Sequence, residues 1–387
     1  GTATNITFGS IAFEGTPEPK VGQITLVEKS APSIHVADYA GVRGRTEGDF
    51  EYDLDTDTQT ANAKKILFDG YRFRNAEVRT TASGTNTWAG RSRIGNSTVN
   101  NRLTITGGST TNAYGGWTTG TGTPAAEKFN TKDNTATLNA GTITNLYGGY
   151  TAAAAGKATG NKVFVNGGSV TTNVTGGFGG TDATDNHVTV IGGSVSGTIR
   201  GAQSAGTAHK NTVEIKGGNV HANILGADAV GAATENKVTT TGTVSGNITG
   251  AKSTSGAVTK SVVTIKGNVT GNVTGGQTIG AANANTVDLG AVTINGSVTG
   301  GAGSTTSNNK VNMSGTTVSG VVTGGAGSGT GNALTVKGNN RAGNIAGFQK
   351  LTFNLGNLNR TNPMLRLTNG TATNITFGSI AFEGTPE

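Results

Sequence analysis

The chain has no cysteine, 6 prolines in 387 residues, and few charged or aromatic side chains. Without cysteine it can form no disulfide framework and perform no thiol catalysis. Scarce proline excludes a collagen triple helix, and no apolar run approaches the ~18 residues of a membrane-spanning helix. The chain is rich instead in glycine, with 65 residues. Because β-branched residues recur in order and charge is low, we expect an all-β protein rather than a disordered one.

A pattern of about 25 residues recurs from residue 101 onward. Each copy begins with asparagine, continues with alternating valine or isoleucine, bends at glycine, and ends with a second short apolar segment. Residues 161–177, 186–202 and 211–227 are clear copies. Ten copies can be counted, spaced by 23–27 residues except for one step of 33. A repeat this regular indicates a stacked architecture.

Stacked short strands account for the pattern. Alternating apolar residues are typical of a strand, and glycine supplies the bend between strands. One copy is too small to bury its own apolar side, so copies must stack. The sequence predicts an all-β, parallel β-solenoid of about ten coils, with two internal columns: Val163, Val188, Val213, Val238 and Val263 in the first, and Val174, Ile199, Ile224, Ile248 and Val273 in the second.

The repeat also divides the chain into three regions. Residues 1–95 lack it and are predicted to form a β-rich junction or capping region. Residues 96–350 form the solenoid array, and residues 351–387 form terminal strands.

The asparagine that opens each copy is predicted to form a structural ladder, because it recurs too regularly for a ligand site. Asparagine tolerates the left-handed conformation of a sharp corner, and stacked amides can hydrogen-bond along the axis. The ladder comprises Asn101, Asn134, Asn161, Asn186, Asn211, Asn236, Asn285, Asn309 and Asn332, and Ser261 interrupts it. The preceding residues Asp185, Lys210, Glu235 and Lys260 are predicted to form an alternating charge column, worth about 0–1 kcal/mol per pair.

The two ends of the chain have one sequence. Residues 1–18 and 370–387 both read GTATNITFGSIAFEGTPE. Three explanations are open: a longer protein built from 369-residue units, a continuous polymer divided at an arbitrary point, or a segment exchanged between subunits. We expect residues 370–383 to pack against the next unit, and residues 1–14 against the array of this one. The predicted junction residues are Ile6, Phe8, Ile11, Phe13, Ile375, Phe377, Ile380 and Phe382.

The pattern at 161–177, with a looser form at 261–276, resembles the solenoid passengers of bacterial autotransporter-type surface proteins and related large, repetitive adhesins. The resemblance covers about two thirds of the chain. It implies a right-handed β-helix on the outside of a Gram-negative cell, and it indicates no ligand.

Two functions from different classes remain open. The first is a structural subunit of an extracellular bacterial surface fibre or stalk, with copies of the chain joined end to end. The second is an adhesin that binds glycans or proteins on host or neighbouring cells. The insertions at 120–133 and 150–160 carry small, bland residues, which favours the structural role.

Other classes of function are not expected. The array contains no cluster of carboxylates, so we expect no enzyme and no cofactor. Asp53, Asp55 and Asp57 alternate along an acidic strand but lack the glycine and glutamate of a calcium-binding loop, so no metal is expected. Two tryptophans and scattered tyrosines give no stacking platform in the sequence, and nucleic acid is therefore not an expected partner.

Overall fold

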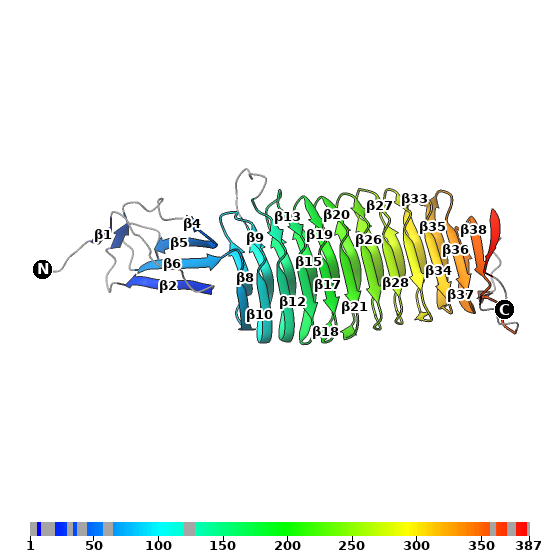
Figure 1. The fold of residues 1–387 in the computed structure, drawn as a ribbon, viewed down its shortest axis with the longest axis horizontal. Coiled ribbons are helices and arrows are strands. Elements are labelled where there is room, and N and C mark those ends of the chain that lie inside the picture. Colours follow the sequence, from blue (N-terminus) through cyan, green and yellow to red (C-terminus); the bar gives the residue numbers. More distant parts are fainter. Residues whose placement is uncertain are drawn as a thin grey trace.

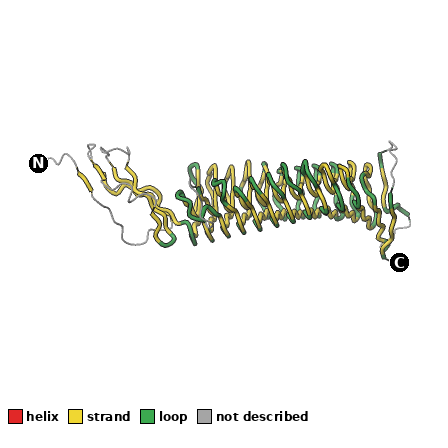
Figure 2. The backbone as a smooth tube through the Cα atoms, turned by 90° about the horizontal axis from the view of Figure 1, so that it is seen from above, coloured by secondary structure: helices red, strands yellow, loops and turns green. Residues whose placement is uncertain are grey.

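The computed structural model describes residues 6–8, 20–28, 34–36, 45–56, 65–119, 128–356, 361–369 and 377–384. These residues form an elongated rod of parallel strands, with a small antiparallel sheet beside its N-terminal end (Figure 1). Successive turns lie one behind another along the rod axis (Figure 2). Every regular element in these ranges is a strand, and none of them contains a helix long and apolar enough to cross a membrane.

The prediction of an all-β, parallel β-solenoid is confirmed, with about 12 turns in place of about ten. The first face of the rod consists of the strand that opens each turn. Its members, paired in parallel along the axis, are β7 (Glu77–Ala82), the starts of β10 (Arg102–Thr118) and β12 (Thr135–Thr151), β14 (Lys162–Val165), β17 (His187–Val190), β21 (Thr212–Ile215), β25 (Lys237–Thr240), β28 (Val262–Ile265), β31 (Thr286–Leu289), β34 (Lys310–Ser314), β36 (Ala333–Lys337), β38 (Lys350–Asn354) and β40 (Ser379–Glu383).

After the glycine bend the chain forms a narrow second face and then a wider third face. The second face includes β18 (Ser194–Val195), β22 (Asn219–Val220), β32 (Thr293–Ile294) and β39 (Leu365–Leu367). The third face includes β8 (Asn86–Ser92), the ends of β10 and β12, β15 (Ser169–Gly179), β19 (Thr198–Ser204), β23 (Asn223–Ala229), β26 (Ile248–Ser253), β29 (Val273–Gln277), β33 (Val298–Thr305), β35 (Thr317–Ser328) and β37 (Asn340–Ala346).

A short strand forms the fourth face before the next turn begins. This sheet consists of β9 (Thr98–Val99), β11 (Thr131–Lys132), β13 (Lys157–Thr159), β16 (Asp182–Thr184), β20 (Thr207–His209), β24 (Ala233–Thr234), β27 (Val258–Thr259) and β30 (Ala282–Asn283). The strands within each of the four faces are parallel to one another, because every turn crosses each face in the same direction.

Both predicted internal columns are present. Val163 pairs with Val188, and Val188 with Val213, in the register that continues along the first face. Ile199 pairs with Ile224 in the same way on the third face. These side chains are fully buried. Each buried valine or isoleucine contributes roughly 1.5–3 kcal/mol relative to an exposed one, so the columns supply most of the favourable free energy of the rod.

The rod extends beyond the boundaries expected from the repeat. It begins at β7, before the expected boundary at residue 96, and it continues through β38 to β40. The first turn lacks the asparagine and glycine of the later copies, because Ala76 takes the place of Asn101 and Ala82 lies opposite Gly108. The repeat pattern therefore misses turns that pair in the same register as the rest.

The N-terminal sheet contains four antiparallel strands in the order β2 (Lys20–Glu28), β6 (Lys65–Arg72), β5 (Phe50–Thr56) and β4 (Arg45–Glu47). A separate pair joins β1 (Ile6–Phe8) to β3 (Ile34–Val36) in parallel. The chain passes from β6 into β7, so the sheet connects directly to the first turn of the rod (Figure 1).

Candidate functional site

The asparagines at the start of each turn form a chain of amide hydrogen bonds inside the rod. Asn186 Nδ2 donates to Asn211 Oδ1 at 2.9 Å, and Asn211 Nδ2 donates to Asn236 Oδ1 at 3.0 Å. The same bond joins the pairs Asn101–Asn134, Asn134–Asn161, Asn161–Asn186, Asn285–Asn309 and Asn309–Asn332. All nine side chains are buried.

Where the ladder is continuous, as at Asn211, the amide uses all of its donors and acceptors. Asn211 Nδ2 donates a second bond to the carbonyl oxygen of Ala183, and Asn211 Oδ1 accepts a second bond from the backbone N–H of Asn186. A buried amide without partners would cost several kcal/mol, whereas these amides satisfy donors and acceptors in neighbouring turns. The ladder therefore holds adjacent turns in register, and a fully bonded amide such as Asn211 has no donor left for a ligand.

The sharp corner itself lies one residue earlier than expected. The left-handed conformation belongs to the residue before the asparagine, such as Asp185 with φ 55° or Lys210 with φ 53°. The expectation that the ladder asparagines adopt it is therefore wrong. The reason is steric: the corner side chain must point outward, whereas the asparagine side chain must point into the rod.

Two positions in the ladder differ from the sequence pattern. Ser261 takes the place of an asparagine, and its buried hydroxyl makes no hydrogen bond. At the C-terminal end, Gln349 Oε1 accepts the backbone N–H of Asn332 at 2.9 Å and so extends the ladder. Gln349 was not expected, because its turn is only 17 residues long and breaks the spacing of the repeat.

The four residues of the predicted charge column occupy successive exposed corners. The backbone N–H of Asp185 donates to His209, that of Lys210 to Thr234, and that of Glu235 to Thr259. Within residues 128–356, no ion pair joins members of this column; the pairs found there involve other residues. The expected stabilisation by alternating charges is therefore not seen, because left-handed corners direct these side chains outward into solvent.

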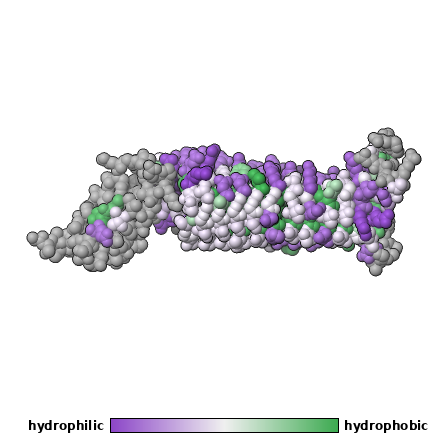
Figure 3. All heavy atoms as spheres, turned by 90° about the horizontal axis from the view of Figure 1, so that it is seen from below, coloured by the Kyte–Doolittle hydropathy of each residue, from purple (hydrophilic) through white to green (hydrophobic). Residues whose placement is uncertain are grey.

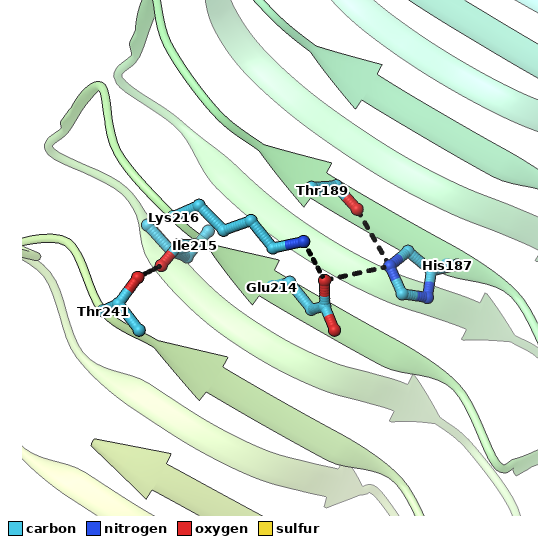
Figure 4. A network of polar contacts seen from close by, with 6 residues as sticks. All are labelled: His187, Thr189, Glu214, Ile215, Lys216 and Thr241. Atoms are coloured by element: carbon cyan, nitrogen blue, oxygen red, sulfur yellow. Dashed lines mark hydrogen bonds and ion pairs between the residues drawn. The ribbon is translucent and has the colours of Figure 1, made fainter. Parts of the chain in front are cut away.

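A small polar network lies on the first face instead, between β17 and β21 (Figure 4). Lys216 Nζ lies 2.9 Å from Glu214 Oε2, and His187 Nε2 lies 3.7 Å from the same oxygen. Burial lowers the pKa of His187, and the nearby Glu214 carboxylate opposes this shift. The hydrogen bond from Lys216 lowers the pKa of Glu214. The network bridges neighbouring strands and contains no group poised as a nucleophile.

The C-terminal copy of the duplicated segment forms the last strand of the rod. In β40, Ile380 pairs with Leu351 and Phe382 pairs with Phe353 of β38. The two side chains continue apolar columns of the core, yet they are 56% and 67% exposed because no further turn covers them. The Phe353 and Phe382 rings stack with centroids 6.2 Å apart.

This arrangement adds to the expectation for residues 370–383. Within that range, β40 pairs with β38 of its own array, which the sequence did not predict; packing against a following unit stays a prediction. Phe377 is half-buried against the core of the same rod. At the N-terminus, Ile6 and Phe8 belong to β1, which pairs with β3. Ile11, Phe13 and Ile375 lie outside the described residues.

An aromatic face, which the sequence analysis missed, covers the outer side of the third face in its first four turns. It comprises Trp88, Tyr114, Trp117, Tyr147, Tyr150 and Phe178. The Tyr114 and Tyr147 rings stack with centroids 5.3 Å apart, and those of Tyr150 and Phe178 stack at 4.6 Å. Burial raises the pKa of Tyr114 and Tyr147, so both phenols stay protonated.

Polar side chains border the aromatic face. Asn86, Asn112, Asn145 and Asn173 form an outer amide row, in which each Nδ2 donates to the Oδ1 of the preceding turn at 2.8–3.0 Å. Arg200 Nη1 donates to Asn173 Oδ1 at 3.0 Å and continues this row.

The arginines next to the aromatic face are already engaged. The guanidinium group of Arg200 lies 3.2 Å from the carboxylate of Asp228. The guanidinium of Arg91 lies 4.4 Å from the Trp88 ring centroid and 5.2 Å from that of Trp117. The aromatic face is therefore flanked by the Arg200–Asp228 ion pair, by Arg91 stacked on two of its rings, and by neutral amides.

The expectation that the aromatic residues give no stacking platform is therefore wrong. The signal in the sequence was an aromatic residue on both sides of a Gly-Gly pair, in YGGW at 114–117 and YGGY at 147–150. Turns of unequal length hide this recurrence, since 33 residues separate Tyr114 from Tyr147. A search that aligned glycine pairs instead of counting residues would have found it.

The remaining surface offers little that suggests chemistry. Figure 3 shows a long face of the rod on which near-neutral residues predominate, with hydrophilic residues gathered along one margin and toward the C-terminal end. No group of three or more metal-ligating side chains occurs among the described residues. Asp57 lies outside them, as do the side chains of Asp53 and Asp55.

One buried carboxyl lies where the N-terminal sheet meets the rod. Glu51 of β5 is 4% exposed and accepts hydrogen bonds from Ser92 Oγ at 2.6 Å and the backbone N–H of Arg93 at 2.7 Å. Burial raises the pKa of Glu51, although these hydrogen bonds oppose the shift. The acidic strand is therefore not exposed along its whole length, because Glu51 attaches the sheet to the first turn.

Comparisons of this chain with protein families, with curated proteins and with solved structures find no match.

Proposed function

We propose that this chain is a structural unit of an extracellular bacterial surface fibre or stalk, built from 369-residue units joined end to end. The observation that carries the proposal is a uniform rod within a chain whose two ends have one sequence. About 12 turns stack on a single axis, and the 18 residues of the first segment recur at the C-terminus without a change. At ~4.8 Å per turn, the rod of one unit is roughly 58 Å long.

The interior of the rod supports a mechanical role. Neighbouring turns are joined by strand pairing on four faces, by buried apolar columns and by the asparagine ladder. Such a solenoid is a sum of similar turns with similar interfaces, so it keeps one cross-section along its length. The resemblance to autotransporter-type passengers supports the surface of a Gram-negative cell as its location.

The test compares one unit with two consecutive units in a single chain, both purified and observed by electron microscopy. We expect the two-unit particle to be twice as long as the one-unit particle and to have the same width. Two rods that lie side by side, or a particle of unchanged length, would refute the fibre role. Circular dichroism of both chains provides the control for folding.

A second function, attachment to a glycan, is favoured by the aromatic face. Aromatic side chains beside neutral amides suit sugar rings, which present C–H groups to the aromatic surface and hydroxyls to the amides. The fold does not require aromatic residues there, since Thr249, Thr274 and Thr299 occupy equivalent outer positions in later turns. A nucleic acid is less suited, because Arg200 is already paired with Asp228.

Tryptophan fluorescence tests this second function directly. Trp88 and Trp117 are the only two tryptophans in the chain, so all of the tryptophan emission comes from residues of the aromatic face. We expect neutral oligosaccharides, such as hexamers of β-1,4-linked N-acetylglucosamine or glucose, to change the emission with saturation. Tyr150→Ala should weaken this binding, while Phe164→Ala on the first face should not. An emission unchanged by all sugars, or equal binding by both variants, would exclude glycan attachment at this face.

A further inference from the structure

The duplicated segment makes two different strand pairs in its two copies. In the N-terminal copy, β1 pairs with β3: Ile6 lies opposite Ile34, Thr7 opposite His35 and Phe8 opposite Val36. In the C-terminal copy, residues 379–383 pair with β38 at the end of the rod. Those residues have the same sequence, SIAFE, as residues 10–14.

The two pairs use neighbouring parts of one sequence. The part used in β1 is ITF, which recurs at residues 375–377, directly before Gly378 and the strand β40. A single copy is therefore long enough to make both pairs at once, because one strand ends two residues before the other begins. Within one unit the partners β3 and β38 lie at opposite ends of the molecule (Figure 1). One copy can meet both partners only when the C-terminal end of one rod meets the N-terminal region of another.

The end of the rod needs a cover. Ile380 and Phe382 belong to apolar columns that are fully buried further back, at Leu334 and Val336, and they are exposed only because the stack ends. In the described residues the strand register gives β40 one partner, β38, so its outer edge carries no further strand. Open strand edges with apolar side chains invite another chain, and natural solenoids cover them with a cap.

The length of the segment that links the duplicated strand to β2 determines what would cover this end. In a continuation of the unit, residues 15–19 would link the last strand of one rod to β2 of the next unit. Five residues span at most ~18 Å, so β2 must begin close to Ile380 and Phe382. The antiparallel sheet that starts with β2 would therefore lie against the open end of the preceding rod.

We infer that the duplicated segment bridges two copies of this chain: its SIAFE part forms the last strand of the preceding rod, while its ITF part pairs with β3 of the following unit. The sheet of the following unit then covers Ile380 and Phe382. This inference rests on the proposed fibre, and it specifies the junction that the fibre would use.

The absence of cysteine provides a direct test, because one introduced thiol is unique in the chain. Phe382→Cys is placed in the one-unit chain and at the internal junction of the two-unit chain, and its rate of alkylation is measured. We expect alkylation about tenfold slower or more at the internal junction, because the following sheet covers the site. Ile279→Cys, at a side chain 76% exposed, is the matched control and should react equally in both chains.

A second variant tests the pairing with β3. Proline at position 376 removes a backbone donor from the ITF strand and leaves residues 379–383 intact. In the two-unit chain, Thr376→Pro at the internal copy should widen the distribution of angles between the two rods in electron micrographs. The same change at the terminal copy, Thr7→Pro, should leave these angles unchanged, since no rod precedes it.

The outcomes separate the junction from the fibre. If Phe382→Cys reacts equally in both chains while the two-unit particle is twice as long, the bridge is wrong and the fibre stands. If Thr7→Pro and Thr376→Pro have the same effect, the pairing with β3 across units is wrong. If the two-unit particle is not extended, the proposed fibre itself fails.

Discussion

The single gap in the asparagine ladder gives the sharpest test of what holds the rod together. Ser261 replaces the asparagine of its turn, and its hydroxyl is buried without a partner. Asn236 Nδ2 retains its bond to the carbonyl oxygen of Ala208 at 3.1 Å, whereas Asn211 donates both to a carbonyl and to the next amide. The change Ser261→Asn should therefore complete the ladder and stabilise the rod.

The size of the stabilisation expected for Ser261→Asn can be worked out from a turn in which the ladder asparagine makes all of its hydrogen bonds. Asn211 makes two bonds through Nδ2 and accepts two through Oδ1, all of 2.8–3.0 Å. A net gain of ~1 kcal/mol for each bond, less ~1 kcal/mol for fixing the side chain, gives about 2–3 kcal/mol. The side chain has room, because the residue that faces the ladder is alanine in all three turns: Ala202 with Asn211, Ala227 with Asn236 and Ala251 with Ser261.

The assay must be local, because a long solenoid does not unfold in one cooperative step. Native-state hydrogen exchange of the strands β25 and β28, on either side of the gap, reports the free energy of opening at that site. Asn211→Ser is the matched control, since it creates the same gap in a continuous part of the ladder. It should lower the local free energy of opening by about the amount that Ser261→Asn raises it.

One result would refute this reasoning. If Ser261→Asn leaves exchange unchanged or accelerates it while Asn211→Ser has no effect, the amide bonds contribute nothing beyond strand pairing. The ladder would then be a consequence of close packing and not a cause of stability.

Three further predictions concern the backbone and two titrating groups. Gly201→Ala should destabilise the rod locally by about 2 kcal/mol or more, because its Cβ would overlap the carbonyl oxygen of Gly226. Native-state hydrogen exchange of β19 and β23 is the measurement, and Ala202→Gly is the control. Because burial raises the pKa of Glu51, attachment of the N-terminal sheet should be strongest below pH 4.5 and should weaken as pH rises. The emission of Trp88 should follow this dependence on pH, and Glu51→Gln should abolish it. Because burial lowers the pKa of His187, stability should fall as pH falls below 6.5, and His187→Gln should flatten that part of a denaturation profile.

The sequence predicted the contacts of the buried core better than those of the surface. The columns through Val188 and Ile199 followed from the sequence, because alternation within a strand fixes which side chains are buried. The charge column through Lys210 did not follow, because regular spacing places corners in register without bringing their side chains together. The first turn at β7 was missed because it lacks the repeated residues, although it pairs in register and its alanines are buried in the core.

The sequence alone determined that short parallel strands stack in a solenoid, that one asparagine per turn lies on a common line, and that both ends carry one segment. Local periodicity and composition are sufficient for these features, because each turn repeats the same physical requirements. Only the tertiary structure decided that Tyr114 and Tyr147 form one aromatic face, that Gln349 extends the ladder, and that residues 379–383 close the rod. These contacts join turns of unequal length, so they depend on the register between strands and not on the number of residues between them.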